Sequence, residues 1–342
     1  MRGRTQETKT MTPSLPEDQT EKKSPAIFWV VVPCFNEEEV IEETAGELRA
    51  RLMAMIEDGL IRPESRVLFV DDGSRDGTWE ILRRLVKADP LIAALRLRGN
   101  GGHQNALYAG LMEAKDYCHV SVSMDADLQD DPDLIPAMVE KFYEGNDIVY
   151  AVRKSRRGEG LFKRASAFGF YRFMEAMGAS IPKDCGDFRL MSREAIKALS
   201  LFGEDRPFLR GLVPLLGFPS AQVTFDRRPR KRGRSKYSLK AMVRFALDGL
   251  ISLSARPIHL ILIGGILLFL TAGGYLLCSA GREPGVRQIL ASIWAAAGLT
   301  LLGIGVTGEY IGRIWREMAG RPRYIARERI GEWGGNITPG SN

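Results

Sequence analysis

The chain has 342 residues, so it is too long for one average domain and long enough for a large core plus an accessory part. Its formal net charge is +6. Its four cysteines have no CxxC spacing, which argues against a disulfide framework and indicates a reducing compartment. Acidic residues concentrate before residue 150 and basic residues after it, which suggests an anionic partner for the second half.

The first 25 residues are rich in Thr, Glu, Lys, Pro and Gln and contain no apolar run that a secretory signal would need. We expect this tail to be disordered. Short apolar runs then alternate with helical patterns as far as residue 237, and five of these runs predict strands: 26–33, 65–72, 91–97, 119–125 and 146–153. The alternation predicts a mainly parallel, Rossmann-like α/β sheet with helices on both faces, in which ligands bind beyond the carboxyl ends of the strands.

Acidic residues follow two of the predicted strands. In "DDGSRDGT", Asp71 and Asp72 can accept hydrogen bonds from ribose hydroxyls or base N–H groups, although an ordinary turn that caps the next helix would also explain them. In "DADLQDD", Asp125 and Asp127 project to the same side of the chain. A divalent cation such as Mg2+ or Mn2+, with a diphosphate, would make this crowding of charge tolerable, whereas the alternative is a solvated acidic loop.

Two apolar stretches near the C-terminus lack Lys, Arg, Asp and Glu. They cover residues 258–278 and 289–308, each about 30 Å long as a helix, which is enough to cross a bilayer. We expect a two-helix transmembrane hairpin within residues 257–312, with a pair of buried helices in a large soluble domain as the alternative. Lys and Arg residues concentrate outside the hairpin, so both termini, including a C-terminal tail at 313–342, are expected in the cytosol.

Residues 238–256, which precede the first span, have apolar residues at helical spacing and charged residues on another face. This pattern predicts an amphipathic helix at the membrane surface, or else a core helix of the soluble domain.

Taken together, "VVPCFNEEE", "VDDGSRDGT", "GGHQNAL", "DADLQDDP", "GDFRLMSR" and "RGRSKY" resemble glycosyltransferase family 2, which has the GT-A fold. Within that family the chain is most similar to the polyisoprenyl-phosphate glycosyltransferases, such as bacterial undecaprenyl-phosphate glucosyltransferases and, more distantly, dolichyl-phosphate mannose synthase. The resemblance extends over residues 27–325. It implies a multi-pass enzyme of the bacterial inner membrane that moves a sugar from a nucleotide sugar, such as UDP-glucose or GDP-mannose, to a polyprenyl phosphate.

The resemblance also implies roles for individual residues. The nucleoside would be held by Pro33, Asn36, Glu37, Asp71, Asp72 and Ser74. Asp125 would contact the nucleotide and the metal, Asp127 would serve the metal and catalysis, and Gln129 would complete the metal shell. Asp187 would orient the acceptor or act as a base, although an Asp after Gly is often only a turn residue. Phosphates of the donor or the lipid would meet Arg153, Arg230, Ser235, Lys236 and Tyr237.

One part of the family pattern is missing, because Gly99 and Gly101 stand where relatives usually carry an arginine and an aromatic residue. Contacts around the third strand end are therefore an open question. His103 follows this segment, and a lone histidine at a helix start is more often a local hydrogen-bond partner than a catalyst. We also expect a homo-oligomer, such as a tetramer.

Other functions remain as alternatives. A processive polysaccharide synthase usually carries a QxxRW motif, which this sequence lacks. A soluble-type transferase would not need the hairpin, and a non-enzymatic alternative is a membrane-anchored nucleotide-binding scaffold. No nucleic-acid partner is expected, because the basic run at 227–238 abuts a membrane span and no nucleic-acid motif accompanies it.

Overall fold

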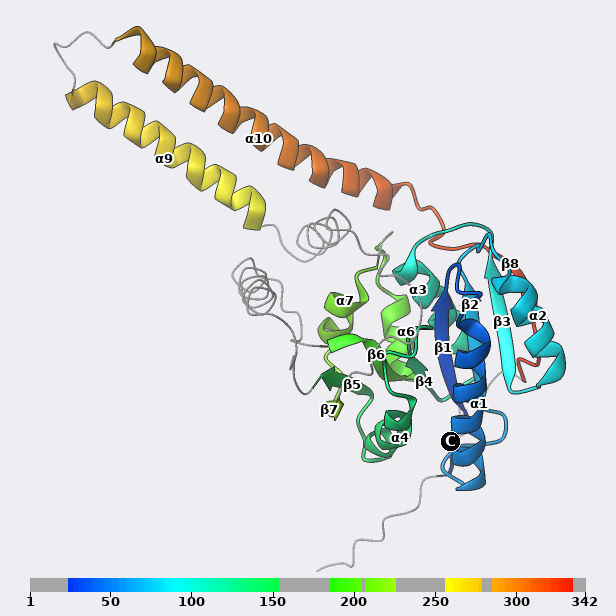
Figure 1. Cartoon of the computed structure of the whole chain (residues 1–342). Coiled ribbons are helices and arrows are strands. Elements are labelled where there is room, and N and C mark those ends of the chain that lie inside the picture. The colour runs from blue at the N-terminus through cyan, green and yellow to red at the C-terminus, as the bar shows by residue number, and fades with distance from the viewer. Residues whose placement is uncertain (1–23, 154–184, 205–206, 226–255, 279–284, 335–342) are drawn as a thin grey trace, which may run out of the picture.

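The structure is a computed structural model, and it describes residues 24–153, 185–204, 207–225, 256–278 and 285–334. Its described core is an eight-stranded sheet in the order β7-β5-β6-β4-β1-β2-β3-β8 (Figure 1). The strands are β1 (Phe28–Cys34), β2 (Arg66–Asp71), β3 (Ile92–Leu97), β4 (Val120–Ser123), β5 (Ile148–Arg153), β6 (Cys185–Ser192), β7 (Ser220–Phe225) and β8 (Ala326–Ile330). All five predicted strands are confirmed, and β1 to β4 run parallel to one another.

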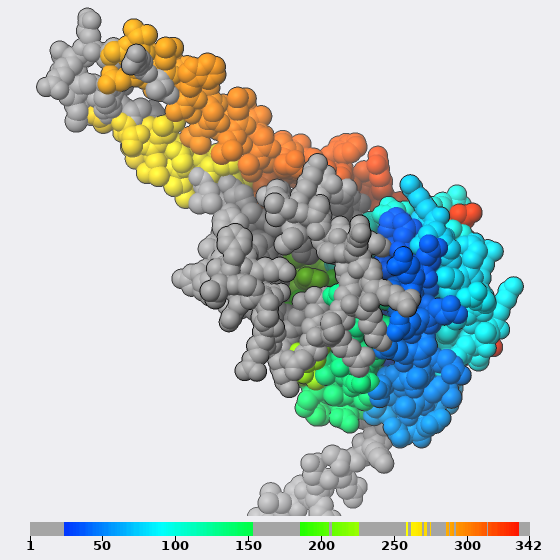
Figure 2. Space-filling view, in the orientation of Figure 1, coloured from blue at the N-terminus to red at the C-terminus, as the bar shows by residue number. Residues whose placement is uncertain are grey.

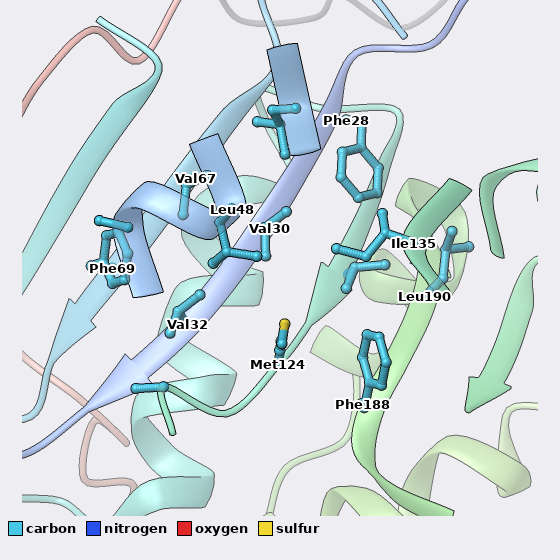
Figure 3. Packing of buried hydrophobic residues seen from close by; sticks show 14 of the residues in the cluster. Phe28, Val30, Val32, Leu48, Val67, Phe69, Met124, Ile135, Phe188 and Leu190 are labelled. Atoms are coloured by element: carbon cyan, nitrogen blue, oxygen red, sulfur yellow. The ribbon is translucent and has the colours of Figure 1, made fainter. Parts of the chain in front are cut away.

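Helices cover both faces of the sheet, as predicted. One face carries α1 (Ile41–Glu57), α2 (Thr78–Ala88), the 3-10 turn η1 (Pro132–Leu134) and α4 (Ile135–Tyr143), and the other carries α3 (His103–Ala114), α6 (Arg193–Ser200) and α7 (Leu209–Leu215). Successive residues of β1 alternate between the two apolar layers: Phe28, Val30 and Val32 belong to one, which Figure 3 shows, and Trp29 and Val31 belong to the other. Both faces of β1 are therefore buried, as expected for a central parallel strand.

Strand β6 reverses direction within the sheet. It runs antiparallel to β4, with Ser123 opposite Arg189, and antiparallel to β5. The first residues of β6 consequently lie beside the carboxyl end of β4, where ligands are expected in a sheet of this kind.

Two long helices follow the sheet in sequence, α9 (Arg256–Cys278) and α10 (Val286–Met318). They contact each other and extend away from the sheet as a hairpin (Figure 1), which protrudes in the space-filling view (Figure 2). Both predicted spans lie within them. By length and composition the segment Gln288–Met318 is apolar enough to cross a membrane, and its most apolar part is not buried inside the molecule.

The C-terminal segment differs from the predicted tail. Helix α10 continues to Met318, and Ala326–Ile330 form β8, which pairs antiparallel with β3 at the edge of the sheet. The sheet therefore includes residues far outside the predicted catalytic range of 26–237. Ion pairs and an aromatic cluster hold this segment: Arg83–Glu328, Arg329–Glu113, and Trp333 packed on Trp29 and Tyr117.

Several predictions fall outside the described residues. These are the disordered tail, apart from its last two residues, and the amphipathic helix at 238–256, of which only Arg256 is described. Among the described cysteines, Cys34, Cys118 and Cys185 are buried and free.

Candidate active site

The candidate site lies where β1, β2 and β4 end and β6 begins. Asp71 closes β2, and Asp125 follows β4 by two residues. Because β6 is antiparallel to β4, Asp187 is brought to the same edge of the sheet as Asp125 although the two are far apart in sequence. The topology thus gathers the predicted acidic residues at the carboxyl ends of the parallel strands.

Asp187 is the most heavily contacted of these carboxylates. Its side chain is 4% exposed and receives hydrogen bonds from Nη2 of Arg189 at 2.8 Å and from Nε2 of Gln104 at 3.0 Å. Arg210 approaches both carboxylate oxygens, with Nε 3.3 Å from Oδ1 and Nη2 3.0 Å from Oδ2. Burial disfavours the charged carboxylate, but Arg210, His103 and Arg189 outweigh burial and hold the pKa of Asp187 well below its usual range.

His103 links the two acidic strand ends. Its Nε2 atom lies 3.4 Å from Asp187 and 3.5 Å from Asp125. Burial opposes protonation of the imidazole, but the hydrogen bond to Asp187 and the charge of Asp125 dominate and raise the pKa of His103 to about 9. At neutral pH the histidine is therefore a cation, and its partners are distant in sequence rather than local.

Asp125 is contacted differently from Asp187: Nε2 of His103 lies 3.5 Å from its Oδ1. Its Oδ1 atom is buried and makes no hydrogen bond within the described part of the chain, although the side chain as a whole is 40% exposed. Burial, and then the charges of Asp187 and Asp127, raise the pKa of Asp125 against the opposing effect of His103. A buried carboxylate oxygen without a hydrogen bond is a suitable ligand for a cation, so this donor fits the predicted metal.

The other predicted metal ligands lie next to it. Asp127 accepts a hydrogen bond from the backbone N–H of Gln129 at 3.2 Å, and Gln129 is itself 8% exposed. Among the described residues, no group of three or more His, Cys, Asp and Glu side chains is placed to hold a metal ion. A cation here would therefore depend on other oxygen donors, such as phosphates and water.

The turn after β2 contains the second acidic pair. Asp71 is fully buried: its Oδ1 accepts the N–H of Ser74 at 3.0 Å, and its Oδ2 lies 3.3 Å from Nε of Arg96. Asp72 accepts the backbone N–H groups of Gly101 and Gly102, each at 2.8 Å. These contacts shape the protein itself, and the predicted contacts with a nucleoside remain predictions.

The remaining predicted nucleoside residues join this turn to the end of β1. Pro33 is buried opposite Val70 in the ladder, whereas the backbone N–H groups of Asn36 and Glu37 donate to Ser74 Oγ and Thr78 Oγ1, both at 2.9 Å. Asn36 has a φ of 54°, a left-handed conformation that Asn tolerates better than most residues. The two strand ends therefore form one hydrogen-bonded unit.

The glycines that depart from the family pattern lie against this unit. A Cβ at Gly99 would meet nothing within 4 Å, so the loop has room for a side chain there. Gly101 is tighter, since a Cβ would lie 3.3 Å from Cβ of Asn105. Its backbone contact with Asp72 shows that the loop is anchored without the arginine and the aromatic residue.

Arg153 ends β5, and Arg230, Ser235, Lys236 and Tyr237 lie outside the described residues. Three contacts of Asp187 were missed by sequence reasoning: Gln104, Arg189 and Arg210. A signal existed for Arg189, because residues two apart on a strand share a face. No local pattern marked Arg210, which comes from α7.

Comparison with known proteins agrees with this geometry. The model of the family "Glycosyl transferase family 2" matches residues 29–200. The chain belongs to glycosyl transferase family 2. It is a glycosyltransferase with the GT-A-like α/β fold of that family.

Individual relatives match over most of their length. The chain is 43% identical to the uncharacterised glycosyltransferase YkoT of Bacillus subtilis over 309 residues, 89% of this chain and 92% of the relative. It is 35% identical to the SfII prophage-derived bactoprenol glucosyl transferase of Shigella flexneri, over 87% of this chain and 97% of that protein. A crystal structure of glucosyl-3-phosphoglycerate synthase from Mycobacterium tuberculosis, with Mn2+, UDP-glucose and phosphoglyceric acid, matches with 21% identity and a TM-score of 0.45, covering 71% of this chain and 85% of that one.

Proposed function

We propose that this glycosyltransferase moves a sugar, with glucose from UDP-glucose as the first candidate, to a polyprenyl phosphate such as undecaprenyl phosphate. The product would serve modification of a cell-envelope glycan. Similarity to bactoprenol glucosyl transferases over nearly their full length supports the acceptor class. The helix pair α9 and α10 supports a site at a membrane, where a long polyprenyl tail can remain in lipid.

The observation that carries the proposal is the pairing of unlike charges at one sheet edge. Asp125 has a buried oxygen that accepts no hydrogen bond from the described residues and faces His103 at 3.5 Å, and the cationic His103 and Arg210 both contact Asp187 beside it. A nucleotide sugar and a lipid phosphate both bring phosphate groups, so a site for them needs positive charge and a cation-binding carboxylate together.

Asp125 and Asp127, with Gln129, would hold Mg2+ or Mn2+. When bound, such a cation would offset the charge that develops on the leaving diphosphate. The acceptor phosphate is already anionic near neutral pH, so it needs little help from a general base. Asp187 fits the orienting role better than the role of a base, because its carboxylate is engaged by two guanidinium groups and its pKa is lowered.

A single displacement by the acceptor phosphate would invert the anomeric configuration. An α-linked donor would then give a β-linked lipid phosphate. The catalytic domain and both termini would lie on the cytosolic side, where nucleotide sugars are made, with Arg230, Ser235, Lys236 and Tyr237 near the lipid phosphate. A homo-oligomer remains part of this proposal.

The decisive experiment is turnover by the purified full-length protein in lipid nanodiscs. Nucleotide sugars are supplied one at a time with undecaprenyl phosphate and Mn2+ or Mg2+, and the lipid product is analysed for sugar identity and anomeric configuration. We expect one donor to be preferred, a β-linked product, and reversible loss of activity on addition of EDTA. Binding of nucleotide sugar without transfer to any polyprenyl phosphate would favour the scaffold and reject the enzyme proposed here.

A further inference from the structure

Arg210 lies in the first turn of α7, and its guanidinium contacts the carboxylate of Asp187 on β6. Its side chain keeps 35% of its surface exposed, whereas its partner Asp187 is 4% exposed. The same carboxylate is bound from the inside by Arg189, whose side chain is 2% exposed. One buried acid thus binds one buried and one partly exposed arginine.

Two arginines share the carboxylate of Asp187. Asp187 and Arg189 are both buried and neutralise each other, as a buried ion needs an opposite charge. Arg210 brings a second guanidinium to the same carboxylate, and its side chain reaches the surface. Its long side chain is fixed by contacts of both Nε and Nη2 with Asp187, so the guanidinium is already oriented before any ligand arrives.

Arg210 is also close to the acidic end of β4. His103 lies between the two carboxylates, 3.4 Å from Asp187 and 3.5 Å from Asp125. Arg210 is near enough to Asp125 to act on its carboxyl electrostatically. A partly exposed, oriented guanidinium near Asp125 suits an anion with several oxygens, and phosphate is the anion that the proposed chemistry supplies.

We infer that Arg210 is a phosphate-binding residue of the active site and that Asp187 is the positioning residue that presents it. This inference rests on the proposed function and adds a residue to it, since the ligand is either the donor diphosphate or the acceptor phosphate. The rival explanation is structural: Arg210 would only help to neutralise Asp187. The two explanations differ in whether loss of Arg210 changes the affinity for phosphate in protein that is still folded.

The test compares Arg210→Gln and Arg210→Lys with the wild type, all as full-length protein in nanodiscs. Arg84→Gln is the matched control, because Arg84 also approaches both oxygens of a carboxylate, that of Glu42, on the exposed surface of α1 and α2. Two dissociation constants are measured: inorganic pyrophosphate with Mn2+ by calorimetry, and undecaprenyl phosphate by native mass spectrometry. Thermal unfolding of each variant shows what fraction is folded.

We expect Arg210→Gln to weaken the binding of one of the two probes by about ten-fold or more. Arg210→Lys should weaken it less, because lysine keeps the positive charge but lacks the planar guanidinium with its paired N–H donors. Loss of pyrophosphate affinity alone would assign Arg210 to the donor, and loss of undecaprenyl phosphate affinity alone to the acceptor. Changes below two-fold in both, as in Arg84→Gln, would overturn the inference whatever the melting temperature, and so would a wild type that binds neither probe. Failure of the wild type to transfer sugar would instead count against the proposed function.

Discussion

Two acidic pairs, Asp71 with Asp72 and Asp125 with Asp127, lie at the ends of parallel strands of the same sheet, yet their surroundings differ. Asp71 and Asp72, after β2, are 0% and 2% exposed, and backbone N–H groups of Ser74, Gly101 and Gly102 bond to them. Asp125, after β4, has a buried Oδ1 that accepts no hydrogen bond among the described residues and lies 3.5 Å from Nε2 of His103. Oδ2 of Asp71 is in the same condition, 3.3 Å from Nε of Arg96. What differs is access: the first pair is enclosed by the loops that it holds, whereas the side chain of Asp125 remains 40% exposed and can be reached by a ligand.

This difference in surroundings determines which carboxylate can bind a ligand at low cost. A carboxylate that already accepts two backbone hydrogen bonds must lose them to bind something else, at a cost of about 1–3 kcal/mol for each group left unsatisfied. The carboxylate of Asp125 is 40% exposed, and its buried oxygen faces His103 at 3.5 Å, so a cation can approach it from solvent. We therefore expect a metal at the strand end of β4, whereas the turn at β2 holds the neighbouring loop.

The largest effect is expected at Asp187, the buried carboxylate of β6 that pairs with Arg189 and Arg210. Asp187→Asn would leave the buried Arg189 facing a neutral amide, and an unpaired buried charge costs about 3–5 kcal/mol. The free energy of unfolding, measured by chemical denaturation, should fall by that amount. Glu42→Gln is the control: it breaks the exposed pair with Arg84 and should cost below about 1 kcal/mol. Equal losses in the two variants would contradict the charge account of this site.

The second effect is a loss of activity without a loss of stability when Asp125 is replaced. Asp125→Asn removes a carboxylate whose pKa is raised by burial, so the folded protein should be no less stable without metal. Sugar transfer should nevertheless fall by at least about a hundred-fold, because the cation loses its charged ligand. Turnover and unfolding are measured on the same preparation. Asp133→Asn is the control in the same acidic run: it breaks a surface ion pair with Arg51, so it should cost below about 1 kcal/mol of stability and leave sugar transfer unchanged.

Much of the fold could be predicted because its signals are local. Each run from 26–33 to 146–153 combines apolar residues with a polar boundary, and each became a strand. Strand β8 could not be found in this way: its sequence, ARERI, has no apolar run, and its contacts are with residues distant in the chain, such as Glu113 of α3. An edge strand needs only one paired side, so charged residues are tolerated there.

The site was predicted unevenly for the same reason. Asp125 and Asp127 were recognisable from their spacing, and the family resemblance pointed to Asp187. The structure adds the surroundings that decide what each carboxylate can do, namely Arg189 and Arg210 around Asp187 and the absence of a hydrogen bond at Asp125 Oδ1 within the described residues. Such contacts join residues from three elements, and no local pattern encodes them.

A third, smaller effect tests the framing role of the turn after β2. In Asp72→Asn the new amide can accept only one of the N–H groups of Gly101 and Gly102, and its own NH2 group would face the other donor. The free energy of unfolding should fall by about 1–3 kcal/mol. Transfer activity, corrected for the folded fraction, should fall much less than in Asp125→Asn. A loss of activity as large as that of Asp125→Asn, without destabilisation, would instead support the predicted nucleoside contact of Asp72.

The smallest effect is the pH dependence of stability that His103 contributes, since its imidazole lies between Asp125 and Asp187. The pKa of His103 is about 9 in the folded protein, against an ordinary value of 6.5. Protonated His103 therefore stabilises the fold fully below pH 6.5, and this contribution is lost as the pH rises through about 9. The side chain is 33% exposed, so solvent screening limits the gain to about 1–2 kcal/mol. Because other groups titrate as well, the measured quantity is the difference in unfolding free energy between wild type and His103→Gln, in EDTA, at pH 6 and at pH 10. We expect this difference to be larger at pH 6; a difference that is constant with pH would mean that His103 stays neutral between Asp125 and Asp187.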